Sequence, residues 1–152
     1  MKILCKGLLI SSFLFLITPF FLNANNIQVS NISLTGLDEN NGTVLIEFDL
    51  SWENSWRLSV GPANYDAAWI FVKFRRNNGN WGHAYLNYVN GTAAGDGHTA
   101  PAGSIIYTAS DSTGCFIYRD TDGSGNVNYN DVQLQWNYLN AGVNQDDILD
   151  IQ

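Results

Sequence analysis

Hydrophobic and polar residues alternate along much of this chain, most clearly over residues 43–52. Every second residue there, from Val44 through Trp52, is apolar, and most of the residues between them are polar. Successive side chains of a strand point to opposite faces, so the pattern predicts a strand with one buried and one solvated face. Helical periodicity is nearly absent, which indicates an all-β protein.

Other segments carry related patterns. Residues 27–34 alternate but change register near Ser30 and Asn31, which predicts a β-bulge. Residues 67–74 are apolar on both faces, and we expect a central strand covered on both sides. Further strands are predicted at residues 81–89, 104–108, 114–118, 131–138 and 147–151.

Turn-forming residues separate these segments. Asn41-Gly42, Asn78-Gly79 and Asn90-Gly91 tolerate the positive φ angles of tight turns, and residues 93–103 have the composition of a long loop. About eight strands at regular spacing predict a single β-sandwich, either immunoglobulin-like or jelly-roll.

The first residues have the features of a secretory signal peptide. Lys2 and Lys6 give a positively charged start, an apolar run follows over residues 7–21, and Ala24 is a small residue at a cleavage position. The run is shorter than the ~18–20 residues that cross a membrane. We therefore expect residues 1–24 to be removed and residues 25–152 to be exported to the periplasm, cell surface or medium. Residues 147–152 look like an interrupted strand, so the domain is expected to be the N-terminal part of a longer protein.

Charge and cysteine content narrow the function further. The net charge of −7 disfavours nucleic acid and anionic membrane surfaces as partners. Cys115, which would be the only cysteine after signal cleavage, lies in an apolar run. A free cysteine in such a run is expected to be a small buried hydrophobe and not a nucleophile.

The stretch "RDTDGSGNVNYND" matches the spacing of a calcium-binding loop. Alternating oxygen ligands on a glycine-bearing turn suit this ion, and the candidate ligands are Asp120, Asp122, Ser124, Asn126 and Asp131. The segments on both sides are strand-like, however, whereas such loops border helices. The alternative is a turn between two strands whose Asp and Asn residues cap local amides, and we expect weak calcium binding or none.

Three stretches resemble a known family: "SWENSWRLSVGPANYDAAWIFVKFR", "GNWGHAYL" and "GCFIYRDTDGSGNVNYNDVQLQWNY". With the start "NNIQVSNISLTG", they resemble the N-terminal β-domain of bacterial exported proteins of the formylglycine-generating, sulfatase-modifying-factor-like family. In that family the domain precedes a module of catalytic type, whose copper is held by a cysteine pair. This chain has no such pair. The resemblance therefore implies an accessory domain with no catalytic residue of its own.

Aromatic residues suggest a second kind of site. Exposed flat rings stack on sugars, and Trp56 and Trp81, near predicted strand ends, are the better surface candidates among the tryptophans. Two hypotheses follow. The first is a non-catalytic interaction domain whose partner is a C-terminal module of the same protein or another exported protein. The alternative is a secreted carbohydrate-binding module, with or without calcium as a cofactor.

Overall fold

The computed structural model describes residues 25–152, so the predicted signal peptide lies outside the described part of the chain. The fold is all-β, as predicted, with one short 3-10 turn, η1 (Leu139–Ala141). No helix within the described residues is long and apolar enough to cross a membrane. The strands are β1 (Gln28–Asp38), β2 (Thr43–Leu58), β3 (Asn64–Tyr65), β4 (Ala68–Ile70), β5 (Val72–Arg76), β6 (Trp81–Ala84), β7 (Ser104–Thr108), β8 (Cys115–Arg119), β9 (Gly123–Asn137) and β10 (Leu149–Ile151).

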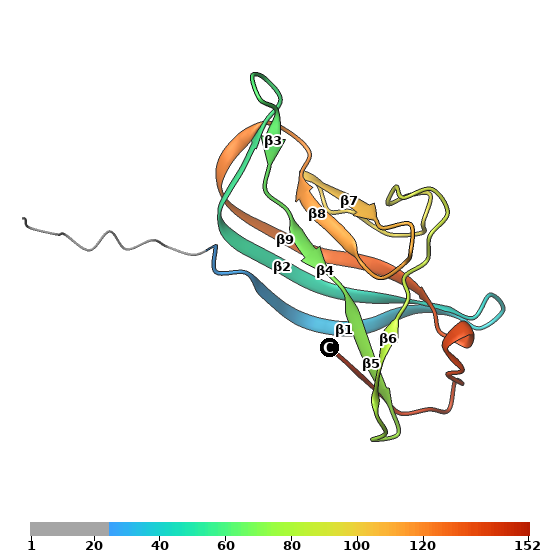
Figure 1. Cartoon of the computed structure of the whole chain (residues 1–152). Helices are drawn as coiled ribbons and strands as arrows, with labels where there is room; N and C mark the ends of the chain where they lie inside the picture. The colour runs from blue at the N-terminus through green and yellow to red at the C-terminus, as the bar shows by residue number, and fades with distance from the viewer. Residues whose placement is uncertain (1–24) are drawn as a thin grey trace, which may run out of the picture.

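The first layer is built on β2. Strand β1 pairs with the first part of β2 along one edge. Strand β9 pairs antiparallel with the opposite edge of β2, from Thr43 to Arg57. The short β3 pairs with the last residues of β2. Figure 1 shows β1, β2 and β9 as long curved strands running side by side.

The second layer consists of two small sheets that share the segment at residues 68–76. Strand β4 pairs with β8, which pairs with β7, while β5 pairs with β6 and β10. Phe71 stands where the partner changes from β8 to β6. In Figure 1, β4 and β5 follow one another across the long strands of the first layer.

The core lies between these layers and follows the predicted alternation. The buried apolar residues of β2 are Val44, Ile46, Phe48, Leu50 and Trp52, and those of β9 include Val132, Leu134 and Trp136. Cys115 is free and buried, as expected. Burial raises the pKa of its thiol to about 12, so the thiol stays protonated at neutral pH.

β-Bulges bend the first layer, and one carboxylate joins two of them. The predicted bulge in β1 is confirmed at Asn31, which has a φ of 53°, and β9 has a second bulge at Asp131, with a φ of 55°. Asn31 Nδ2 donates to Asp49 Oδ2 at 2.6 Å, and the Asp131 N–H donates to Asp49 Oδ1 at 3.0 Å. These bonds hold the pKa of the Asp49 carboxyl below its usual value.

Several expectations about the strands are wrong. Residues 67–74 form no central strand: they divide into β4 and β5, and the side chains of Trp69 and Phe71 are 39% and 48% exposed. The central pair is β2 and β9. Strand β9 begins at Gly123 and not at residue 131, because the second half of β2 offers it a ladder, and β6 ends at Ala84, well short of residue 89.

The central pairing predicts where stability resides. Leu134 in β9 has no exposed surface, so Leu134→Ala should lower the free energy of unfolding by about 2–5 kcal/mol through lost burial and a cavity. Trp69→Ala removes a larger but partly exposed ring and should cost clearly less. Urea unfolding of both variants checks this. Equal losses of stability in the two variants would contradict the assignment of Leu134 to the core and of Trp69 to the surface.

Candidate functional site

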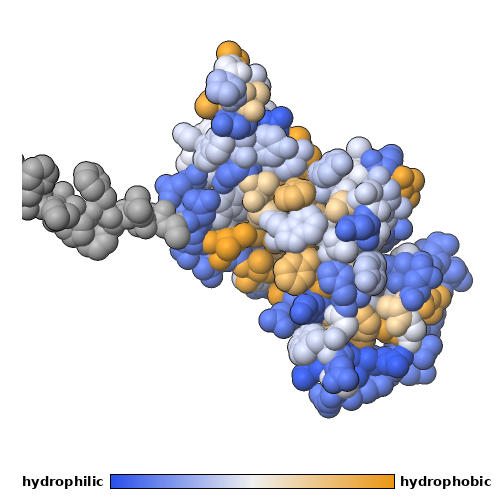
Figure 2. All heavy atoms as spheres, viewed as in Figure 1, coloured by the Kyte–Doolittle hydropathy of each residue, from blue (hydrophilic) through white to orange (hydrophobic). Residues whose placement is uncertain are grey.

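An apolar groove opens between the two layers beside β1. It has a volume of about 340 Å³. Its lining comes from β1, β2, the β4–β5 segment and the end of β10, and comprises Ile27, Val29, Ile32, Ile46, Phe48, Trp69, Ile70, Phe71, Val72, Ile151 and Gln152. Figure 2 shows apolar residues gathered on the face of the molecule drawn in Figure 1.

The groove exists because the second layer leaves β1 uncovered. Val29 is opposite Leu50, and Leu34 is opposite Ile46, in the β1–β2 ladder. Both partners are buried, so Val29 and Leu34 point toward the inside of the fold. Val29 nevertheless remains 46% exposed. The second layer therefore covers this part of β1 only in part.

The opposite wall is the β4–β5 segment, whose side chains alternate between two faces. Ala68 and Val72 are buried and Ile70 is partly buried, so the even-numbered residues face inward. Trp69 and Phe71 face outward and line only the rim. Strand β4 is the edge of its sheet among the described strands, since β8 pairs with it on one side alone.

Strand β10 closes one end of the groove. The backbone N–H of Lys73 donates to the carbonyl of Gln152 at 2.8 Å, and the Gln152 N–H donates back to the Lys73 carbonyl at 2.9 Å. The ladder runs on to Asn77, whose N–H donates to the Ile148 carbonyl at 2.9 Å. Asp150 and Arg75 form an ion pair at 2.7 Å beside it.

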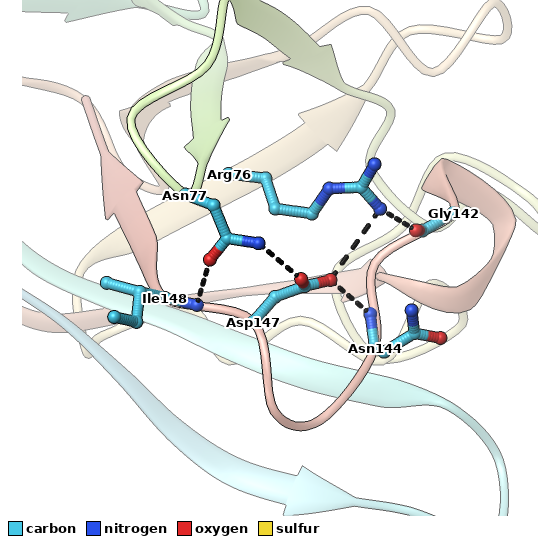
Figure 3. A network of polar contacts seen from close by, with 6 residues as sticks. All are labelled: Arg76, Asn77, Gly142, Asn144, Asp147 and Ile148. Atoms are coloured by element: carbon cyan, nitrogen blue, oxygen red, sulfur yellow. Dashed lines mark hydrogen bonds and ion pairs between the residues drawn. The ribbon is translucent and has the colours of Figure 1, made fainter.

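A polar network fixes the start of β10 (Figure 3). The carboxylate of Asp147 accepts the Asn144 N–H at 2.8 Å and the Asn77 side-chain amide at 2.8 Å, and Arg76 lies 3.6 Å away. Arg76 also donates to the Gly142 carbonyl, and the Ile148 N–H donates to the side chain of Asn77 at 3.0 Å. The Asn144 N–H and the other donors hold the pKa of Asp147 low. The network thereby sets the register in which β10 meets β5.

The lining decides what the groove can bind. No ionisable side chain lines it, and Gln152 is the one polar residue among those that do. Such a surface cannot hold an ion or polarise a bond. It can bury apolar side chains, each of which is worth about 1.5–3 kcal/mol when fully buried.

The five residues of the calcium pattern do not share one loop. Asp120 and Asp122 lie in the turn after β8, whereas Ser124, Asn126 and Asp131 lie along β9. Ser124 is opposite Trp56, and Asp131 contacts Asp49, so the two sit at different places along β2. Because an extended chain advances about 3.3 Å per residue, Asp131 lies ~20 Å along β9 from Ser124.

The carboxylates of this stretch have other partners. Asp122 Oδ2 accepts both the N–H and the hydroxyl of Ser59, at 3.0 and 2.6 Å, which ties the turn to the end of β2. Among residues 25–152, no three His, Cys, Asp or Glu side chains gather in a way that could hold a metal ion. In this stretch the Gly, Asp and Asn residues form the connection between β8 and β9 and the bulge at Asp131.

The two predicted sugar-binding tryptophans lie far apart. Trp56 belongs to the end of β2 in the first layer, and Trp81 begins β6 in the second. The end of β2 beside β3 and the start of β6 lie at opposite ends of the molecule (Figure 1). Each is partly exposed, and the guanidinium of Arg75 lies 5.0 Å from the centre of the Trp81 ring.

A different set of rings does gather on the outer face of the β4–β8–β7 sheet. Phe116 is opposite both Trp69 and Tyr107 in its ladders, and its ring centre lies 4.7 Å from that of Trp69. Tyr65 stacks on Tyr118 at 4.5 Å. We call these five rings the aromatic strip. The sequence analysis placed every ring of the strip except Tyr65 in a predicted strand but did not identify the strip as a surface, although Tyr107, Phe116 and Tyr118 alternate with the buried Ile106 and Ile117.

Comparison of the chain with protein-family models, with curated proteins and with solved structures finds no match. The resemblance to the formylglycine-generating-enzyme-like family therefore stays a prediction from the sequence.

A buried polar cluster lies within the segment at residues 85–100. This segment runs along the edge of β9 that does not pair with β2. Asp96 Oδ1 accepts the backbone N–H groups of Val89, Asn90 and Gly91, at 2.6, 2.9 and 3.2 Å. His98 Nδ1 accepts the Gln135 N–H at 2.9 Å. Burial lowers the pKa of His98 to about 4, although Asp96 acts in the opposite direction. His98 is thus neutral in the fold.

This histidine predicts an acid-sensitive stability. An unfolded chain takes up the proton near pH 6.5 and the folded one near pH 4, so stability is complete above pH 6.5 and falls as the pH drops toward 4. Between pH 7 and pH 5 the loss should be about 2 kcal/mol. His98→Asn keeps an acceptor for Gln135 and should flatten this dependence, measured by urea unfolding at both pH values. His83→Asn serves as the control, and an unchanged slope in His98→Asn would refute the assignment.

Proposed function

We propose that this chain is a non-catalytic interaction domain of an exported protein and that it binds another polypeptide in the apolar groove. The observation that carries the proposal is the exposed inner face of β1. Val29 points toward the inside of the fold but remains 46% exposed. A buried-type surface left open in this way is the usual mark of an interaction site.

The shape of the groove favours a polypeptide over a small ligand. Small-molecule sites combine an enclosed apolar cavity with a few convergent polar groups. Here the cavity is open, its single polar lining residue is Gln152, and one wall is the edge of a sheet. A sheet edge supplies backbone hydrogen bonds, which a peptide can match along its whole length.

The sequence resemblance supports the same function. An accessory domain that precedes a catalytic-type module is expected to contact a polypeptide and to carry no reaction itself. The proposed parent is therefore an exported protein of the formylglycine-generating-enzyme-like family. The partner is a further module of that protein or another exported protein.

Selection from a library of random displayed peptides tests this function. The full chain should select peptides with apolar residues at alternate positions. Val29→Lys places a charge in the groove and should reduce binding of the selected peptides at least tenfold, because the lysine stays unpaired among apolar groups. Val60→Lys, the same exchange at a highly exposed site outside the groove, should leave binding unchanged. Peptides whose binding is indifferent to Val29→Lys would refute docking in the groove.

Carbohydrate binding is the second candidate, and the aromatic strip favours it. The rings of Tyr65, Tyr107 and Phe116 are all more than 40% exposed. The guanidinium of Arg57 lies 5.6 Å from the ring centres of both Tyr65 and Tyr118, which holds that end of the strip in place. Amphipathic rings fixed in this way can stack on sugar rings while their edges remain wet.

Titration calorimetry with cellohexaose and chitohexaose tests the second candidate. If the strip binds either sugar, Phe116→Ala should weaken binding at least tenfold by removing the central ring. Trp81→Ala, which removes an exposed ring elsewhere, should have no effect. Loss of sugar binding in Trp81→Ala alone would move the site to the β5–β6 hairpin, and no binding by the intact chain would dismiss this function.

A further inference from the structure

We infer that a second cavity, between the segment at residues 85–88 and the end of β9, binds a single ring of a neutral sugar. Its volume is about 270 Å³, close to the lower limit of ~300 Å³ for small-molecule sites. No residue lines both this cavity and the apolar groove, and no ring of the aromatic strip lines it. The inference therefore goes beyond the proposed docking function and does not depend on it.

Backbone pairing fixes the walls of the cavity. The N–H of Leu86 donates to the carbonyl of Ser112 at 2.9 Å, and Leu86 also pairs with Trp136 in an isolated β-bridge. The side chains of Leu86 and Trp136 are both buried. Two segments of the lining are thereby tied to β9, so the walls do not need a ligand in order to form.

Two asparagines of the lining are held in fixed orientations. Asn87 Nδ2 donates to the Asp96 carbonyl at 2.8 Å and to Gln135 Oε1 at 2.9 Å. Asn137 Oδ1 accepts the Asn140 N–H at 3.0 Å. Among the described residues, Asn87 Oδ1 has no donor and Asn137 Nδ2 has no acceptor. The lining thus keeps one oriented acceptor and one oriented donor, and a sugar hydroxyl can satisfy either because it both donates and accepts.

Two tyrosines supply the apolar part of the site. Tyr85 and Tyr88 both line the cavity, and their side chains are 59% and 39% exposed. The ring centre of Tyr85 lies 5.0 Å from that of His83, and His83 Nε2 lies 2.7 Å from the carbonyl oxygen of Thr113. This contact supports the Tyr85 ring from one side. The C–H groups of a sugar ring can pack on such aromatic surfaces while the tyrosine hydroxyls stay hydrated.

The charges around the cavity favour a neutral ligand. Among the described residues that line it, none is Asp, Glu, His, Lys or Arg, so an ionic ligand would find no counter-ion there. The net charge of −7 adds repulsion toward anionic sugars. A purely apolar ligand would leave the amides and the Ser112 hydroxyl without partners, which disfavours it. A neutral sugar matches both the rings and the amides.

Saturation-transfer NMR with the full chain tests the site. The probes are the methyl glycosides of glucose, galactose, mannose and N-acetylglucosamine, with methyl glucuronide as the anionic counterpart. At least one neutral glycoside should bind, and the glucuronide should bind more weakly. Tyr88→Ala should weaken binding at least tenfold because it removes an aromatic wall. Phe116→Ala, which removes the central ring of the aromatic strip, should leave binding unchanged.

A second variant tests the polar part of the site. Asn137→Asp keeps the acceptor for the Asn140 N–H and replaces the amide donor with a carboxylate oxygen, so it should also weaken binding at least tenfold. Asn130→Asp adds the same charge at an exposed position outside the cavity and should have little effect.

Four results would overturn the inference. One is that no neutral glycoside binds the full chain, and another is that the glucuronide binds more tightly than all of them. Binding that Phe116→Ala abolishes and Tyr88→Ala leaves intact would place the sugar on the aromatic strip instead. Displayed peptides whose binding is sensitive to Tyr88→Ala and indifferent to Val29→Lys would make the cavity a peptide site.

Discussion

The long antiparallel pairing of β2 with β9 is the interaction on which the rest of the structure depends. It joins Thr43 to Asn137 at one end and Arg57 to Gly123 at the other, and it supplies most of the buried side chains of the first layer. A flat ladder of this length could not enclose a core. The bulge at Asp131 and the irregularity near Asn54, which has a φ of 57°, bend the pair so that its inner face becomes concave.

Asp49 shows how the bend is held. The residue lies on the outer face of β2, and its two oxygens satisfy donors from the bulges of β1 and β9 on either side. From sequence alone, Asp49 and Glu47 are read as solvated charges on a wet strand face. Glu47 in fact accepts the side-chain amide of Gln133 at 2.6 Å. The outer face of the first layer is thus a set of cross-strand polar contacts that fix register.

The local pattern was sufficient to predict the strands with one wet face, and insufficient for those whose environment is set by distant segments. The alternation in β2 and the slip at Asn31 in β1 were both readable, because each reports on the strand itself. Residues 67–74 were misread as central because apolar residues on both faces usually mean burial on both faces. Here the outward residues Trp69 and Phe71 belong to exposed surfaces.

The predicted start of β9 was wrong because local turn signals were outweighed by a distant partner strand. Gly123 and Gly125 are strong turn signals, yet both lie in the strand because β2 continues to Leu58 and offers partners to Trp56 and Arg57. The groove could not be predicted from the sequence either. The apolar residues of β1 have a normal core pattern, and only the width of the second layer decides that they stay uncovered. That width depends on pairings between segments far apart in the sequence.

An uncovered apolar edge attracts strands of any origin, and the boundaries of this groove limit which ones fit. Long flat edges favour self-association. Strand β4 offers only a three-residue edge, extended by Phe71, and β1 carries bulges at Asn31 and before Asp38 that interrupt its free side. The charge of −7 adds repulsion between copies. The lining of the groove therefore favours apolar side chains, while the short edge of β4 limits the length of any segment that could pair with it.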